Sequence, residues 1–163
     1  MAGKMIYLAG PLFSEAERHF LESTAGRLAH CLEIDVVDDI FLPHRDAGEL
    51  GGSLLATRPA IFRSDIEAID AATVVVAWLD GSDVDSGTAT EVGYAYAKGI
   101  PVVGLVTDFR IPSEFSLTRK PDWKINNMIW GMCDSGKSLC LTPDDAARMV
   151  QKLLMKAETE VGK

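Results

Sequence analysis

The run Thr-Val-Val-Val-Ala-Trp-Leu at residues 73–79 limits the possible folds more than any other segment. It is apolar throughout and rich in β-branched residues, so it predicts a strand that is buried on both faces, as is typical of parallel sheets. Residues 5–9 and 101–106 have the same character. Because neighbouring parallel strands need long crossover connections, which are usually helices, we expect strands and helices to alternate along the chain.

Helical patterns fill most of the gaps between these strands. Ser14 and Glu17 match a capping box in front of an apolar stripe that ends at Leu32. Further helices are predicted over 59–72, 88–98, 124–131 and 143–156, further short strands over 34–37 and 138–141, and a long loop over 38–58. The sequence therefore predicts one α/β domain over residues 1–163. We expect a three-layer sandwich with a mostly parallel sheet of about five strands, of the flavodoxin or Rossmann kind.

Charge and composition exclude several classes of function. The net charge is −8 and the 16 lysines and arginines are scattered, so binding to nucleic acid is disfavoured, whereas a neutral small molecule is not. The longest apolar run, residues 71–79, has nine residues and is too short to span a bilayer. The first residues lack a secretory pattern, and the three cysteines lack metal-ligand spacing. We therefore expect a cytoplasmic protein with reduced thiols and no metal site.

Ligands of open α/β sheets bind at the carboxyl ends of the strands. Three segments follow predicted strands and should meet there, namely 10–13, 80–91 and the chain from Thr107 onward. Glu91 is expected in the first turn of the helix 88–98, where the helix dipole favours an ionised carboxylate that can attack a sugar. Thr88 and Glu91 also match a capping box, which is the commoner role for such a pair. The spacing alone leaves both roles open.

Residues 131–138 match the phosphate-loop pattern G-x-x-x-x-G-K-[ST] letter for letter. That pattern binds phosphate only between a strand and a following helix. Here the predicted order is reversed, because the segment follows a helix and precedes the strand 138–141. We therefore predict a solvated helix-to-strand turn rather than a nucleotide site.

Residues 80–95 resemble the signature of the nucleoside 2-deoxyribosyltransferase family. In that family an aspartate is followed six residues later by a nucleophilic glutamate and then by a Gly-Tyr/Arg-Ala helix. Asp85, Glu91 and residues 93–95 occupy these places. Four more segments match in order: 6–13, 63–70 around Asp65, 99–102 and 126–131.

The resemblance implies a retaining, two-step transfer of 2-deoxyribose between nucleobases. Glu91 would attack C1′ of a 2′-deoxynucleoside to form a deoxyribosyl ester, and a second base would then attack that ester. Asp65 would supply the proton for the departing base, and Tyr7 would orient the Glu91 carboxylate. The structural alternatives are a core tyrosine at position 7 and a solvated helix residue at position 65. No metal or organic cofactor is required.

The resemblance also implies which residues bind the substrate. The expected contacts are Asp85, Gly10, Phe13, Ser86, Gly87, Asn126 and Met128. In the family the last two reach a neighbouring subunit's site, so a homo-oligomer, a dimer or a hexamer, is implied. The partners would be 2′-deoxynucleosides and free bases, not nucleic acid or a membrane. The structural alternatives are a turn aspartate at 85 and surface or core residues at 126 and 128. His44 and Arg45 could touch the base, but a solvated loop pair is the commoner reading.

Two other functions compete with the transferase. The first is an N-glycosidase on the same scaffold that hydrolyses 2′-deoxynucleosides or their 5′-monophosphates. The Asp85 carboxylate would repel a phosphate dianion, although Ser82 and Ser86 could still donate hydrogen bonds to it. The second is a nucleotide-sensing domain without activity, which would not need all of the following residues: Tyr7, Asp65, Asp85 and Glu91.

Overall fold

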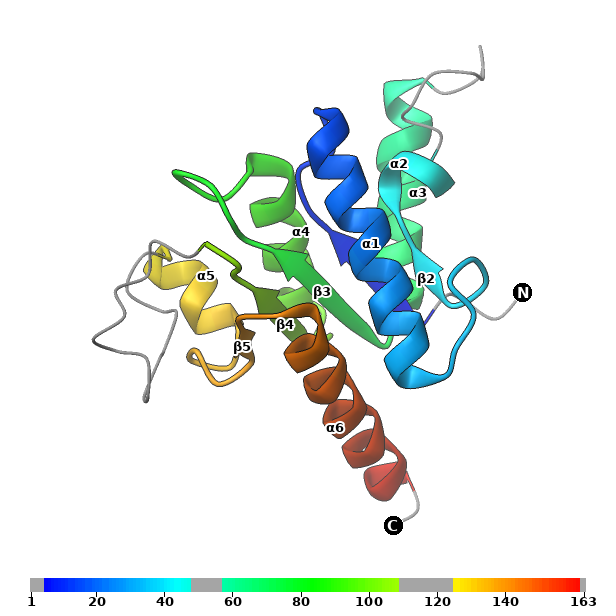
Figure 1. Cartoon of the computed structure of the whole chain (residues 1–163), viewed down its shortest axis with the longest axis vertical. Coiled ribbons are helices and arrows are strands. Elements are labelled where there is room, and N and C mark those ends of the chain that lie inside the picture. Colours follow the sequence, from blue (N-terminus) through cyan, green and yellow to red (C-terminus); the bar gives the residue numbers. More distant parts are fainter. Residues whose placement is uncertain (1–4, 48–56, 109–124, 162–163) are drawn as a thin grey trace.

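Five parallel strands form the sheet, in the order β2-β1-β3-β4-β5 (Figure 1). The structure is a computed structural model, and it describes residues 5–47, 57–108 and 125–161. The elements are β1 (Ile6–Ala9), α1 (Glu15–Leu32), β2 (Ile40–Phe41), α2 (Pro43–Asp46), α3 (Arg58–Ala71), β3 (Val74–Trp78), α4 (Ser86–Ala97), β4 (Val102–Leu105), α5 (Asn127–Met132), β5 (Leu139–Cys140) and α6 (Pro143–Val161). This confirms the predicted α/β class, with a strand order of the flavodoxin kind.

Two apolar cores, one on each face of the sheet, make the structure three-layered. Strand residues alternate between the faces. Ile6 and Leu8 of β1 pack with buried residues of α1 and α6, whereas Tyr7 and Ala9 pack with residues of α3, α4 and α5. Figure 1 shows α1 and α6 together in front of the sheet. Every residue of β1 is buried, which is why its sequence is a continuous apolar run.

The start of α1 forms as predicted. The Ser14 side chain accepts a hydrogen bond from the Glu17 amide at 3.2 Å, and the Glu17 carboxylate accepts one from the Ser14 amide at 2.6 Å. This reciprocal capping box orients the chain where it leaves β1 and turns into the helix.

The segment after α1 differs from the prediction. Residues 34–37 were expected to form a strand, but the second strand is Ile40–Phe41. The Asp35 carboxylate accepts hydrogen bonds from the amides of Val37 and Asp38, so the backbone turns instead of extending. The predicted loop 38–58 also contains β2, α2 and the first residue of α3, while its residues 48–56 lie outside the described residues.

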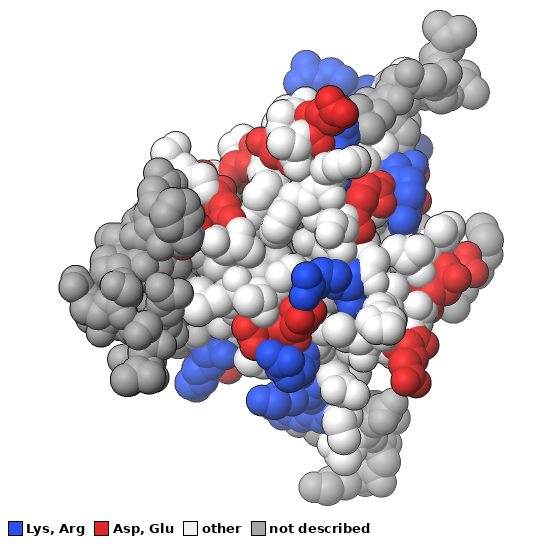
Figure 2. All heavy atoms as spheres, in the orientation of Figure 1, with Lys and Arg blue, Asp and Glu red and all other residues white. Residues whose placement is uncertain are grey.

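The surface and the cysteines agree with the expected chemistry. On the described part of the face in Figure 2, acidic and basic side chains are interspersed and no continuous basic stripe is present. All three cysteines are free, and burial raises the pKa of the Cys133 thiol to about 12 and that of the Cys140 thiol to about 11. Within the described ranges, no helix has the length and apolar character that crossing a bilayer would require.

Candidate active site

The helices that follow β1 and β3 leave the sheet on opposite faces, so the carboxyl ends of these adjacent strands form the topological switch point where such sheets bind ligands. The loop after β3 is held to the end of β4 by Asp80. Its carboxylate accepts a hydrogen bond from the Thr107 amide at 2.7 Å and another from the Thr107 hydroxyl. The segments predicted to surround one crevice therefore do lie along one edge of the sheet.

Asp85 is the N-cap of α4. Its Oδ2 atom accepts hydrogen bonds from the Thr88 amide at 3.0 Å and from the Thr88 hydroxyl at 3.3 Å. The helix thus begins at Ser86, two residues earlier than predicted, and the expected capping box of Thr88 with Glu91 is wrong. Glu91 is the sixth residue of α4, in its second turn, so the first-turn dipole argument for its carboxylate does not apply.

Glu91 instead contacts the core of the sheet. The Tyr7 hydroxyl donates a 2.6 Å hydrogen bond to Oε1 of Glu91, across 84 positions of sequence. Tyr7 is fully buried in β1, and its ring stacks on Phe41 with the ring centres 5.3 Å apart. Because this ring is packed on all sides, the Tyr7 hydroxyl has a fixed position, and its hydrogen bond holds Oε1 of Glu91 in place.

A cavity of about 340 Å³ lies between α3 and α4 beside this pair. Its lining residues are Phe62, Asp65, Ile66, Ile69, Ser86, Gly87, Thr90, Glu91 and Tyr94. The volume is in the range of small-molecule sites, and the lining combines apolar walls with few polar groups, as such sites do. Four residues predicted for the site, Asp65, Ser86, Gly87 and Glu91, are brought together here.

Five of the lining residues were not predicted for the site, namely Phe62, Ile66, Ile69, Thr90 and Tyr94. Phe62 is 68% exposed and stands at the rim, three residues before Asp65 on α3. Thr90 and Tyr94 extend the wall that α4 contributes. Tyr94 also donates a hydrogen bond to Asp70 at 3.0 Å, and Lys98 lies 2.9 Å from the same carboxylate, so α3 and α4 are tied together. Phe62 could have been predicted from the sequence, because residues three apart, such as Phe62 and Asp65, lie on the same face of a helix.

The other predicted binding residues lie outside this lining. Packing explains why residue 10 is a glycine, because a Cβ there would lie 2.8 Å from Leu21. Phe13 and Met128 are 75% and 66% exposed. Asn126 is the N-cap of α5 and accepts a hydrogen bond from the Met128 amide at 2.9 Å. Within one chain the structure therefore does not bring Phe13, Asn126 or Met128 into the Glu91 cavity.

His44 and Arg45 are not the solvated loop pair that was expected. His44 is buried, and its Nε2 atom lies 2.9 Å from Glu22 Oε1 on α1. Arg45 forms an ion pair with Asp46 at 2.9 Å and donates a hydrogen bond to the Ile40 carbonyl. Both side chains thus fix α2 against its neighbours.

Residues 131 and 132 of the phosphate-loop match end α5, and residues 133–138 form the predicted turn before β5, although Cys133 and Ser138 in this turn are buried rather than solvated. Its amides already have partners: those of Ser135, Gly136, Lys137 and Ser138 donate to carbonyls of the same segment and of Trp130. A phosphate cradle needs such amides to be available to the ligand, so the turn cannot act as one.

Replacing Gly136 by alanine is expected to destabilise the protein by about 2 kcal/mol or more without affecting nucleotide binding. Gly136 has a φ of 78°, and a Cβ there would overlap the indole ring of Trp130. Urea unfolding measures the change. Gly131→Ala, in the same motif, is the control, because a Cβ at Gly131 meets nothing within 4 Å and its stability should not fall. Equal stability of the two variants would contradict this role of Gly136.

The described side chains do not gather three histidine, cysteine, aspartate or glutamate residues in an arrangement that could hold a metal ion. What the fold and the Tyr7–Glu91 pair define is an α/β protein with a candidate carboxylate nucleophile at the carboxyl edge of its sheet.

Comparison with known proteins gives the family. A model of the family described as nucleoside 2-deoxyribosyltransferase matches residues 6–146, so the chain belongs to the nucleoside 2-deoxyribosyltransferase family. A conserved protein from Enterococcus faecalis V583 is 30% identical, with a TM-score of 0.73 over 93% of this chain and 99% of that one. The 2-deoxyribosyltransferase from Bacillus psychrosaccharolyticus is 28% identical, with a TM-score of 0.52 over 66% and 76% of the two chains. An uncharacterised protein of Ureaplasma parvum serovar 3 is 29% identical over 132 residues, or 78% of this chain and 81% of its own.

Proposed function

We propose that the protein is a nucleoside 2-deoxyribosyltransferase that moves 2-deoxyribose between nucleobases through a covalent ester on Glu91. One observation carries the proposal: the Glu91 carboxylate is held by the Tyr7 hydroxyl at 2.6 Å and lines a cavity that Asp65 also lines. A carboxylate meant only for helix capping would bond to its own backbone instead. Membership of the family supports the same assignment.

In the first step an oxygen of Glu91 attacks C1′ of the deoxynucleoside, and the bond from C1′ to the base nitrogen breaks. The electron pair of that bond goes to the departing base, which takes a proton or a hydrogen bond from Asp65 across the cavity. Tyr7 binds Oε1 and so holds the carboxylate in place for the attack. The transition state carries positive charge on the sugar, which the Glu91 carboxylate stabilises.

In the second step the nitrogen of an incoming base attacks C1′ of the ester, its N–H proton returns to Asp65, and the Glu91 carboxylate leaves with the bonding electrons. Two inversions restore the starting configuration at C1′. Asp85 would accept a hydrogen bond from the 5′-hydroxyl through Oδ1, since Oδ2 caps α4. Ser86 and Gly87 at the start of α4 line the sugar side of the cavity, and Gly10 and Phe13 follow β1 at the same edge. No step uses a metal or an organic cofactor.

A cytoplasmic location fits the thiol chemistry. The protein has three free cysteines, of which Cys31 is exposed. Exposed thiols persist in reducing compartments and tend to pair in oxidising ones. A cytoplasmic pool would also supply both substrates, the deoxynucleoside and the free base.

The test of the function is an incubation with deoxyinosine and adenine, followed by chromatography. The transferase yields deoxyadenosine and hypoxanthine. Free deoxyribose without deoxyadenosine would identify an N-glycosidase instead, and no product from nucleosides or their 5′-monophosphates would favour a sensing domain.

Tyr7→Phe is expected to lower kcat by roughly 10- to 100-fold with little change in KM, because the hydroxyl positions the nucleophile and need not bind the substrate. The phenyl ring keeps its stacking on Phe41, so the fold should be unaffected. Steady-state kinetics with deoxyinosine and adenine provide the measurement. Tyr96→Phe removes a hydroxyl from a tyrosine that is 58% exposed and outside the cavity, and it should leave kcat unchanged. A Tyr7→Phe enzyme with wild-type kcat would show that the hydrogen bond is only structural.

We also propose a homo-oligomer in which Asn126 and Met128 complete a neighbour's site, since both are exposed and apart from their own chain's cavity. Asn126→Ser keeps an N-cap residue on α5 but removes the amide group. Co-refolding this variant with Glu91→Ala should restore activity that neither has alone, because one site of each mixed pair is then intact. Light scattering should show the oligomer. A monomer, or mixtures that stay inactive, would remove the shared site.

A further inference from the structure

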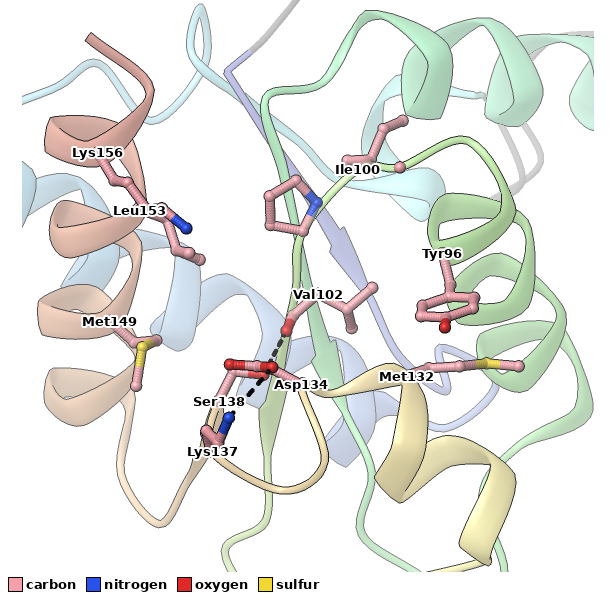
Figure 3. Close-up of a pocket in the computed structure, with 12 residues that line it drawn as sticks. Tyr96, Ile100, Val102, Met132, Asp134, Lys137, Ser138, Met149, Leu153 and Lys156 are labelled. Carbon is pink, nitrogen blue, oxygen red and sulfur yellow. Dashed lines mark hydrogen bonds and ion pairs between the residues drawn. The ribbon is translucent and has the colours of Figure 1, made fainter. Parts of the chain in front are cut away.

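A second cavity, of about 510 Å³, lies at the amino ends of β4 and β5 (Figure 3). Pro101 and Ser138, which directly precede β4 and β5, are among its lining residues. No residue lines both this cavity and the one beside Glu91. The proposed transferase chemistry therefore makes no use of it.

The cavity exists because the edge strand of the sheet is short. Strand β5 has two residues, which pair with Gly104 and Leu105 of β4. Val102, at the start of β4, is beyond this pairing, and its carbonyl instead accepts a 2.7 Å hydrogen bond from the buried Ser138 hydroxyl. The space beside Val102 is thus bounded by helices and a turn rather than by another strand.

The walls of the cavity are mainly apolar and adaptable. Figure 3 shows Met149 and Leu153 of α6 on one side, Ile100 and Val102 in the middle, and Met132 at the end of α5 on the other side. Methionine side chains have several rotatable bonds and fit ligands of irregular shape. Such a lining favours the apolar part of a small molecule.

Two lysines and one aspartate stand on the rim of the cavity, in a chain whose net charge is −8. Lys156 of α6 and Lys137 of the turn before β5 stand on the rim with Asp134 (Figure 3). Lys137 Nζ lies 3.9 Å from Asp134 Oδ1, and both side chains are mostly exposed, at 76% and 70%, so this ion pair is weak. The arginines near the start of α6 are already paired, Arg27 with Asp144 and Arg148 with Asp145, so the lysines on the rim are the basic groups that the proposal uses.

We propose that this cavity binds a small amphipathic anion, whose apolar body fills the space beside Val102 and whose single carboxylate or sulfonate meets Lys137 and Lys156. The segment that matched the phosphate-loop pattern thus contributes a side chain, Lys137, rather than its backbone amides. The apolar body contributes most of the binding free energy, because both lysines lie near solvent, where a single ion pair contributes little. An apolar neutral molecule and a purely polar anion should each bind more weakly.

Fluorescence titration with anilinonaphthalene sulfonate, an aromatic anion, tests the site. We expect saturable binding of one probe per chain. Lys137→Glu and Lys156→Glu should each weaken Kd by roughly fivefold or more, because attraction of the sulfonate becomes repulsion. Lys152→Glu is the matched control, since it makes the same charge change on α6 outside this cavity. Equal weakening by all three would reduce the effect to net charge and overturn the site.

A second pair of variants tests the apolar part. Leu153→Gln should weaken binding, whereas Met155→Gln should not, because Met155 is 62% exposed and does not line the cavity. Octanoate should displace the probe at lower concentrations than octanol does. Circular dichroism checks the fold of each variant. Displacement by deoxyinosine or adenine, or binding that does not saturate, would overturn the proposal, whichever activity the enzyme has.

Discussion

Glu91→Ala is expected to lower the rate of deoxyribosyl transfer by several orders of magnitude while the protein still folds. The carboxylate is the proposed covalent nucleophile, and an alanine side chain cannot form the ester. Its loss should cost about 1–3 kcal/mol of stability, because the buried Tyr7 hydroxyl loses an acceptor, but Glu91 is not the cap of α4 and the helix should persist. Assays of deoxyadenosine formed from deoxyinosine and adenine, together with a urea unfolding curve, measure both effects.

Glu91→Gln separates chemistry from packing more sharply than the alanine variant does. Its amide oxygen has the size of the carboxylate oxygen and can still accept the Tyr7 hydrogen bond, so the cavity keeps its shape. The Gln variant should nevertheless be as inactive as the Ala variant. If either folded variant retained more than a tenth of the wild-type rate, the covalent mechanism would have to be abandoned.

The covalent ester on Glu91 should also be directly detectable. A 2′-fluoro nucleoside destabilises the cationic transition state, so the ester on the wild-type enzyme should form and then persist. Mass spectrometry of a digest should find the sugar on the peptide that contains Glu91. Adding adenine should release it as the 2′-fluoro nucleoside of adenine.

Nucleosides should be used far better than their 5′-monophosphates, by about ten- to a hundredfold or more in kcat/KM. A hydrogen bond from the 5′-hydroxyl to the Asp85 carboxylate contributes roughly 1.5–3 kcal/mol, and a phosphate dianion would be repelled at the same place. The net charge of −8 adds a weaker long-range repulsion, which salt screens beyond roughly 8 Å. The measurement compares deoxyinosine with deoxyinosine 5′-monophosphate.

Asp85→Ser is the variant that isolates this effect. Because Asp85 caps α4, alanine at this position would shorten or fray the helix that holds Glu91. Serine is about as good an N-cap as aspartate, so it removes the negative charge and keeps the helix start. The ratio of kcat/KM should move toward the monophosphate. An unchanged ratio would refute the role of Asp85, and a wild-type preference for the monophosphate would favour the nucleotide hydrolase.

Most of the fold could be predicted from periodicity. The buried strands and the helices that follow them come from long apolar patterns, which tertiary structure rarely overrides. The failures are local and have one cause. Asp35 and Asp85 each direct carboxylate oxygens to nearby backbone amides, which creates a turn in the first case and an early helix start in the second. The pattern of apolar residues does not reveal where a side chain competes for backbone hydrogen bonds in this way.

The site was harder to predict because its main contact is distant in sequence. No pattern relates Tyr7 to Glu91, 84 positions away, and only the resemblance to a family joined them. The parallel register explains the contact afterwards. Tyr7 is opposite Val75 of β3 and points to the face that α4 covers. A contact of Asn126 with another subunit depends on the assembly, and the residues around Asn126 in the sequence carry no pattern that predicts it.

The two walls of the Glu91 cavity differ in how firmly they are anchored. Helix α4 buries Thr88, Val92 and Ala95 against the sheet, whereas α3 buries only Ile69. Segments with few buried contacts open at lower free energy than the core. In hydrogen exchange, amides of α3 should therefore exchange well before those of β1 and α4. Bases of different size can then be admitted by displacement of α3, while the Tyr7–Glu91 pair, anchored on β1 and α4, keeps its geometry until the whole protein unfolds.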